Sequence, residues 1–181
     1  MHLSRDHRNV TVLALCQALF ITGQSIMFIL AGLVGADLTE EKALATLPIS
    51  VIIIATTLTT IPASLLMKRI GRKPGFMIGA TFGVIGALIA SYGIQQSNFW
   101  IFVLGTGTIG TYGGFAQYYR FAAADVAESN FKGKAISLVI SGGIVAAFTG
   151  PLLTNYTFDI NVIPFLGSFV TVAILAATAI L

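Results

Sequence analysis

The sequence predicts an all-α membrane protein with six transmembrane helices. Of its 181 residues, 56% are hydrophobic and only 9% are charged, whereas a soluble domain has about 25% charged residues. The apolar residues fall into six blocks of about 18 or more, and a helix of that length crosses a hydrocarbon layer about 30 Å thick. The blocks lack the polar–apolar alternation of membrane β-strands, and helices satisfy their own backbone hydrogen bonds in lipid. These observations exclude a water-soluble fold.

Short polar turns separate the six expected helices. The first is interpreted as an uncleaved span, because its apolar stretch is longer than that of a signal peptide and runs into an acidic turn. The second contains Pro48 and Pro62, which membrane helices tolerate where neighbouring helices compensate. The fourth begins beside Trp100, an aromatic residue typical of the membrane interface. The expected ranges are 9–35, 45–67, 75–94, 99–124, 135–153 and 162–181.

The basic residues predict the orientation in the membrane. If the turns alternate between the two sides, nine of the ten Lys and Arg residues lie on one side and only Lys42 lies opposite. The positive-inside rule makes that side cytoplasmic, so we expect a multi-pass protein of the cell membrane, inner or plasma, with a cytoplasmic amino terminus. The net charge of +3 does not indicate nucleic-acid binding, because the basic residues are spread over short turns. The nine residues are Arg5, Arg8, Lys68, Arg69, Arg72, Lys73, Arg120, Lys132 and Lys134.

The turn between the second and third helices contains a motif. It reads Ser64-Leu65-Leu66-Met67-Lys68-Arg69-Ile70-Gly71-Arg72-Lys73 and resembles the signature Gly-x-Leu-Ala-Asp-Arg-x-Gly-Arg-Arg/Lys of the major facilitator superfamily. Ser64 replaces the usual glycine and Lys68 the usual acid, so a charge lock resting on that acid is not indicated. The alternative is that the basic cluster only orients the helices through anionic lipid. The matching residues are Arg69, Gly71, Arg72 and Lys73.

Two further segments resemble the same family. The stretch from Gly143 to Pro151 is similar to the Gly-Pro motif of its fifth helix, which is commonest in exporters, although the usual trailing glycine pair is absent. The stretch from Ser129 to Ser137 looks like the family's loop between helices four and five. Gly150 permits close helix contact, and Pro151 removes a backbone donor and bends the helix. This bend is either an ordinary kink or part of a gate.

The resemblance implies twelve helices in two halves, each half made of two three-helix inverted repeats, and transport by alternating access. We therefore expect residues 1–181 to be the amino-terminal half of a protein about twice as long, which a carboxy-terminal six-helix half completes. The expected function is transport of a small solute, with a drug or metabolite exporter as the working hypothesis. The alternatives are a non-transporting scaffold or assembly factor, a dimer of half-transporters and, as a minor one, a metal-ion transporter.

Polar side chains at membrane depth are costly, so those present are candidates for function. Gln17 and Gln24 are seven residues apart on one face of the first helix, about 10 Å apart in height. Gln117 lies on the glycine-bearing face of the fourth helix. The resemblance implies that the first and fourth helices line a central cavity, so these three glutamines are candidate substrate contacts. Alternatively, the amides only link helices through hydrogen bonds.

Arg120 is expected near the cytoplasmic end of the fourth helix. One interpretation is that its side chain extends to the interface. The other is that Arg120, Asp125 and Glu128 form a cytoplasmic gate with the basic turn, with ion pairs that break and reform between states. The glycines Gly75, Gly79 and Gly83, and the pair Gly110 and Gly114, are spaced for close helix packing.

An enzyme is not indicated. Both histidines, His2 and His7, lie in the polar head, and no aspartate lies at mid-membrane, so an intramembrane protease lacks its catalytic groups. Cys16 and Met27 are the soft metal ligands considered, but they lack ligand spacing, so no metal site is predicted. No cofactor is expected. The expected partners are an unidentified small-molecule substrate and the lipid bilayer, and no nucleic acid.

Overall fold

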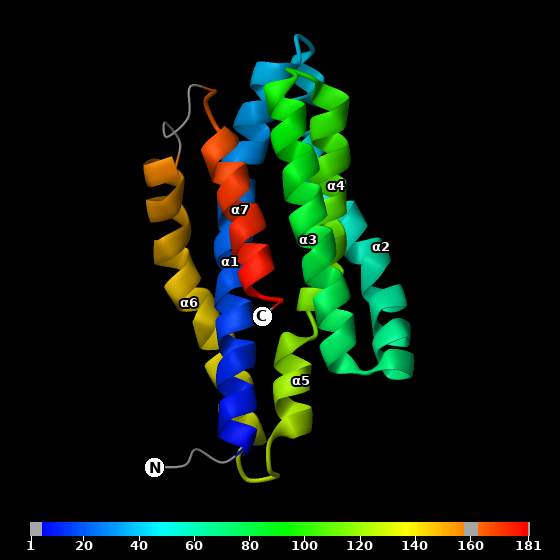
Figure 1. Cartoon of the computed structure of the whole chain (residues 1–181), viewed down its shortest axis with the longest axis vertical. Coiled ribbons are helices and arrows are strands. Elements are labelled where there is room, and N and C mark those ends of the chain that lie inside the picture. Colours follow the sequence, from blue (N-terminus) through cyan, green and yellow to red (C-terminus); the bar gives the residue numbers. More distant parts are fainter. Residues whose placement is uncertain (1–4, 158–162, 181) are drawn as a thin grey trace.

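The computed structural model describes residues 5–157 and 163–180, and within these ranges the chain is helical with no strand. The helices lie side by side along the long axis of the molecule (Figure 1). Their bounds are α1 Arg5–Leu38, the short 3-10 helix η1 Lys42–Leu44, α2 Leu47–Ile70, α3 Arg72–Gln95, α4 Phe99–Ala116, α5 Tyr119–Val126, α6 Lys132–Thr157 and α7 Leu166–Thr178.

Four stretches are long and apolar enough to cross a membrane, namely His7–Leu38, Lys42–Ile70, Arg72–Gln95 and Lys132–Thr157. They coincide with the first, second, third and fifth predicted helices, and the all-α class is confirmed for the described residues. α7, where the sixth helix was predicted, has 13 residues. The predicted ends of that helix, 162 and 181, lie outside the described residues, as do His2 and the side chain of Arg5.

The predicted fourth helix, 99–124, is not continuous. α4 ends at Ala116 and α5 begins at Tyr119. Between them the backbone N–H of Tyr118 donates to the carbonyl of Phe115 at 3.0 Å, a tighter turn than the α-helix makes. α4 packs on α2 and α3, whereas α5 packs on α1 and α6. The turn therefore redirects the chain between two groups of helices, and an apolar run in the sequence gives no sign of it.

Side chains on both sides of the turn hold it. The Tyr118 hydroxyl donates to the backbone carbonyl of Thr60 on α2 at 2.9 Å. The Tyr119 and Tyr112 hydroxyls share a buried hydrogen bond of 3.3 Å across the turn. Each tyrosine thus finds a partner for its polar group inside an apolar bundle, where an unpaired hydroxyl would be costly.

The glycines bring helix backbones into direct contact. A Cβ on Gly93 of α3 would lie 2.5 Å from the backbone nitrogen of Phe102, and one on Gly86 would lie 2.6 Å from that of Ile109. From the α4 side, a Cβ on Gly105 would overlap the backbone nitrogen of Ala90. The predicted small-residue faces are therefore packing faces, because no larger side chain fits there. The other predicted glycines also meet a neighbouring helix: Gly75 meets Met67, Gly79 Phe115, Gly83 Tyr112, Gly110 Ile52 and Gly114 Thr59.

The remaining contacts close the bundle. α1 packs on α6 and α7, α2 packs on α4, and α3 packs on α4 and α7. Where α1 meets α6, the hydroxyls of Thr22 and Thr149 share a hydrogen bond of 2.8 Å. The apolar core has three centres, around Met27 and Phe102, around Phe20 and Tyr119, and around Met67 and Phe115. α1 and α4 contribute residues to the first two.

Replacing Gly105 with Ala tests the α3–α4 contact. The added methyl group has no space beside Ala90, and we expect the variant to lose about 1–3 kcal/mol of stability through overpacking. Thermal unfolding of the purified natural protein in detergent measures the loss. Gly133→Ala is the matched control, because nothing lies within 4 Å of a Cβ there. Equal melting temperatures for both variants would contradict the close contact.

Candidate functional site

Two neighbouring hollows lie where α1 meets α4 and the α4–α5 turn. The first, the Gln24 slot, is bordered by Phe20, Gln24, Met27, Ile52, Ile109 and Tyr112 among others, and has a volume of about 20 Å³. The second, the Gln17 groove, is bordered by Gln17, Phe20, Ile21, Ala116, Gln117, Arg120, Ile140 and Gly143, and has a volume of about 260 Å³. Phe20 borders both hollows, so they are adjacent.

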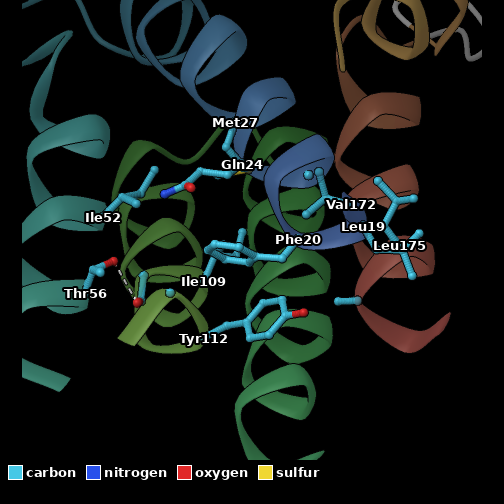
Figure 2. Close-up of a pocket in the computed structure, with 14 residues that line it drawn as sticks. Leu19, Phe20, Gln24, Met27, Ile52, Thr56, Ile109, Tyr112, Val172 and Leu175 are labelled. Carbon is cyan, nitrogen blue, oxygen red and sulfur yellow. Dashed lines mark hydrogen bonds between the residues drawn. The ribbon is translucent and has the colours of Figure 1, made fainter. Parts of the chain in front are cut away.

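The Gln24 slot is almost entirely apolar. Figure 2 shows the Gln24 side chain reaching from α1 across the slot toward Ile52, with Phe20 and Tyr112 on the side opposite Met27. The rings of Phe20 and Tyr112 meet edge to face, with centroids 5.0 Å apart. A volume of about 20 Å³ accommodates one water-sized or methyl-sized group. The slot therefore suits a small apolar projection.

Three polar side chains border the slot, and two of them, Thr56 and Tyr112, already have hydrogen-bond partners. Thr56 donates its hydroxyl to the carbonyl of Gly110 at 2.9 Å, which joins α2 to α4 (Figure 2). The Gln24 amide has no hydrogen-bond partner among residues 5–157 and 163–180. Gln24 thus retains donor and acceptor capacity for a ligand.

Three polar side chains stand among the apolar residues that border the Gln17 groove. Gln17 comes from α1, Gln117 from the α4–α5 turn and Arg120 from α5. Within the described part of the chain, neither amide has a hydrogen-bond partner and Arg120 has no carboxylate partner. The guanidinium carbon of Arg120 lies 5.0 Å from the centroid of the Phe121 ring, a cation–π contact. The structure thus places Gln17 and Gln117 on one groove and Gln24 on the other side of Phe20.

A second group of predicted residues lies at the end of the bundle that contains the start of α1. Arg72 Nε donates to Asp125 Oδ2 at 2.9 Å, and Nη2 of the same arginine pairs with that oxygen. The pair joins the start of α3 to α5, and its side chains are 38% and 59% exposed. Gly71 makes the turn before Arg72 with a φ of +93°, which other residues rarely adopt. Of the predicted cluster, the structure brings together Arg72 and Asp125, while Arg120 lies on the Gln17 groove.

The other residues of the predicted cluster stand apart from that pair. Lys68, Arg69 and Lys73 are exposed, and Ser64 is half-buried on α2. Glu128 is exposed, and its backbone carbonyl accepts from the N–H groups of Phe131 and Lys132. Among the described residues, none of these charged side chains forms an ion pair.

The Gly-Pro motif lies at the contact between α6 and α1. A Cβ on Gly150 would lie 2.6 Å from Ser25 Oγ, so the glycine lets the two helices approach. Pro151 is exposed, and α6 continues past it to Thr157. Gly150 and Pro151 therefore contribute to helix packing beside the Thr22–Thr149 hydrogen bond and border neither hollow, whereas Gly143, at the start of the motif, borders the Gln17 groove.

Sequence reasoning missed the aromatic pair of Phe20 and Tyr112 at the Gln24 slot. Phe20 and Tyr112 belong to apolar blocks in which aromatic residues are common, so composition does not single them out. The spacing of Phe20 and Gln24, four residues apart on one helix face, is the signal that could have indicated it. Within the described residues, no three His, Cys, Asp or Glu side chains gather to hold a metal ion.

A double-mutant cycle on Arg72 and Asp125 measures the coupling free energy of their ion pair. Because both side chains are partly exposed, we expect a coupling free energy below about 1 kcal/mol. Arg72→Gln, Asp125→Asn and the double variant are compared by thermal unfolding of the purified natural protein. A coupling of several kcal/mol would mean that the pair is desolvated in the protein, contrary to this structure.

Comparison with known proteins agrees with the motifs. The model of the Major Facilitator Superfamily matches residues 13–181. The chain is 43% identical, over 176 residues, to the riboflavin transporter RfnT of Brucella anthropi. The alignment covers 96% of this chain and 44% of that relative, so the chain spans less than half of the relative's length. With its long apolar helices and its family match, the chain is a multi-pass membrane protein and belongs to the Major Facilitator Superfamily.

Proposed function

We propose that this chain forms the amino-terminal half of a transporter that moves a small metabolite of the flavin class by alternating access. The observation that supports it most is the 43% identity to a riboflavin transporter. The unpaired amides on the α1–α4 face agree with it, because they offer hydrogen bonds to a polar solute. In this proposal a carboxy-terminal half of similar size completes the cavity, and the chain performs transport rather than catalysis. Because the relative is a riboflavin transporter, a metabolite is the first substrate to test, before a drug.

The six spans of the proposal are α1, α2, α3, the α4–α5 pair, α6 and α7. The helix contacts support an organisation in two three-helix repeats. If α1, α2 and α3 correspond to α4–α5, α6 and α7, the α1–α6 contact corresponds to α4–α2, and the α1–α7 contact corresponds to α4–α3. The α3–α7 contact corresponds to itself. Exchanging the repeats thus turns the two α1 contacts into two others that are observed and leaves the α3–α7 contact in place, which supports the inverted repeat of the proposal.

In this proposal the chain lies in the cell membrane with its amino terminus in the cytoplasm. The start of α1, the turn between α2 and α3 and the loop between α5 and α6 lie at one end of the bundle (Figure 1). The connections from α1 to α2 and from α3 to α4 lie at the other end. The end with the start of α1 holds the basic turns, in agreement with the positive-inside rule.

Labelling of single cysteines tests this orientation. In a Cys16→Ser background, we expect Lys73→Cys to react only with reagents that reach the cytoplasm, and Lys42→Cys to react with impermeant reagents from outside the cell. Both residues are exposed, so the label is not blocked by packing. Labelling of both positions from the same side would contradict the topology.

Transport of riboflavin tests the function. The natural protein containing this chain is expressed in cells that lack their own riboflavin carrier, and labelled riboflavin is followed in both uptake and efflux. We expect movement above the vector control. A well-expressed, folded protein that moves no flavin would contradict the proposal and leave the scaffold hypothesis in its place.

In the same assay, Asp125→Asn tests the gate. Loss of the ion pair with Arg72 changes the balance between transporter states by up to about 1 kcal/mol, so we expect the rate to fall by up to about fivefold. Asp125→Glu keeps the charge and serves as the control. Equal transport rates for Asp125→Asn and the unmodified protein would show that the Arg72–Asp125 pair has no role in transport.

A further inference from the structure

We propose that the outer face of α6 binds one anionic phospholipid at the end of the bundle that contains the start of α1. In this site Lys134 contacts the phosphate of the headgroup, Ser137 contacts the ester-linked glycerol, and the exposed apolar side chains that follow contact an acyl chain. The inference goes beyond the proposed function, because it concerns an outer surface of the bundle and not the transported solute. It requires only that α6 begins at a membrane border.

The site is a groove of about 630 Å³ along the first three turns of α6. α6 packs on α1, α5 and α7 and lies at an edge of the bundle (Figure 1). The groove shares no bordering residue with the Gln24 slot or the Gln17 groove, so it is a separate surface. Its bordering residues are Asn130, Gly133, Lys134, Ser137, Leu138 and Ser141.

The polar side chains at the mouth of this groove are available to a ligand. Asn130, Lys134 and Ser137 are exposed, and none of them has a hydrogen-bond or ion-pair partner in the part of the chain that the structure describes. Glu128 is the carboxylate nearest to Lys134 along the chain, but within residues 5–157 and 163–180 it forms no ion pair. The mouth therefore carries an uncompensated positive charge and several hydrogen-bond donors, which suit a phosphodiester.

The order of groups along α6 matches the order of groups in a phospholipid. Ser137 follows Lys134 by three residues, about 4.5 Å along the helix axis, and in a bilayer the glycerol esters lie just below the phosphate. Leu138, Val145 and Leu152 continue the same side of the helix at intervals of seven residues. They are 44%, 58% and 55% exposed. Charge, hydroxyl and aliphatic surface thus follow one another from the membrane border toward the bilayer centre.

A helix from a carboxy-terminal half is the competing occupant of this face. Helix interfaces in membranes favour small residues, as between α3 and α4, whereas large aliphatic side chains follow the mouth of this groove. Ser141 is the deepest polar residue of the groove, and it donates its hydroxyl to the carbonyl of Leu138 at 2.7 Å. It therefore needs no partner from another helix. A lysine at a membrane border attracts anionic lipid, which favours the phospholipid.

Titration with phosphatidylglycerol, followed by native mass spectrometry of the purified natural protein in detergent, tests the site. Phosphatidylcholine is the reference lipid, because it has the same glycerol esters and no net charge. We expect Lys134→Gln to weaken binding of phosphatidylglycerol about fivefold and to leave binding of phosphatidylcholine unchanged. Ser137→Ala should weaken binding of both lipids by a similar factor, since both carry the ester groups that the hydroxyl contacts.

Lys132→Gln is the matched control. Lys132 carries the same charge two residues away and is exposed, but it does not border the groove. We expect this variant to change the affinity for phosphatidylglycerol by less than about twofold. Equal weakening by Lys132→Gln and Lys134→Gln would mean that the lipid responds to the net charge at this end of the bundle, and would overturn the site.

Two further measurements identify the occupant. Glycerol phosphate has the headgroup chemistry without acyl chains, and at matched concentration we expect it not to displace phosphatidylglycerol. Displacement would assign the groove to a soluble anion and overturn the proposal. Benzoylphenylalanine in place of Leu138 should form phospholipid adducts when it is illuminated in membranes. Cross-linking to a carboxy-terminal half or to a second copy would show that protein covers the groove, and would equally overturn it.

Discussion

Direct contact between the backbones of α3 and α4 is the constraint on which the rest of the bundle depends. Gly86 and Gly93 on α3, and Gly105 on α4, leave no space for a side chain between the two helices. Lipid tails are as apolar as leucine, so helices in a membrane associate through such close packing rather than through the hydrophobic effect. This contact fixes α4, and α4 in turn presents Ile109, Tyr112 and Gly113 to α1. Both hollows therefore depend on glycines that border neither of them.

The turn at Gln117 and Tyr118 brings residues of α5 to the candidate site beside α1. A continuous helix would keep the chain after Ala116 along α2 and α3, whereas the turn directs α5 toward α1 and α6. Gln117 and Arg120 consequently face Gln17 across a groove. The same redirection brings Asp125 to the start of α3, where Arg72 pairs with it. One local interruption of a helix thus determines both the polar groove and the ion pair at the end of the bundle.

Much of the fold could be predicted from the sequence, because a bilayer restricts spanning segments to a few lengths and compositions. Hydropathy located α1, α2, α3 and α6 within a few residues, and the spacing of Gly79 and Gly83 indicated their packing role. The α4–α5 turn escaped prediction because Tyr118 donates its hydroxyl hydrogen bond to Thr60, which is 58 residues away in the sequence. For the site, the cost of polar groups in lipid indicated Gln17, Gln24 and Gln117. The role of Phe20 between the hollows depends on tertiary packing, and its apolar neighbours in the sequence conceal it.

The turn at Gly71 has a mechanical consequence. α2 ends at Ile70 and α3 begins at Arg72, so a single residue with a left-handed backbone joins two helices of 24 residues each. Because one residue connects them, α2 and α3 can change their relative orientation at this end only by rotation about the backbone bonds of Gly71. Because Arg72 is the next residue in the chain, its ion pair with Asp125 connects α5 to the residue beside that joint. Both helices also pack on α4, so any rotation at Gly71 has to be accompanied by sliding of α2 or α3 against α4.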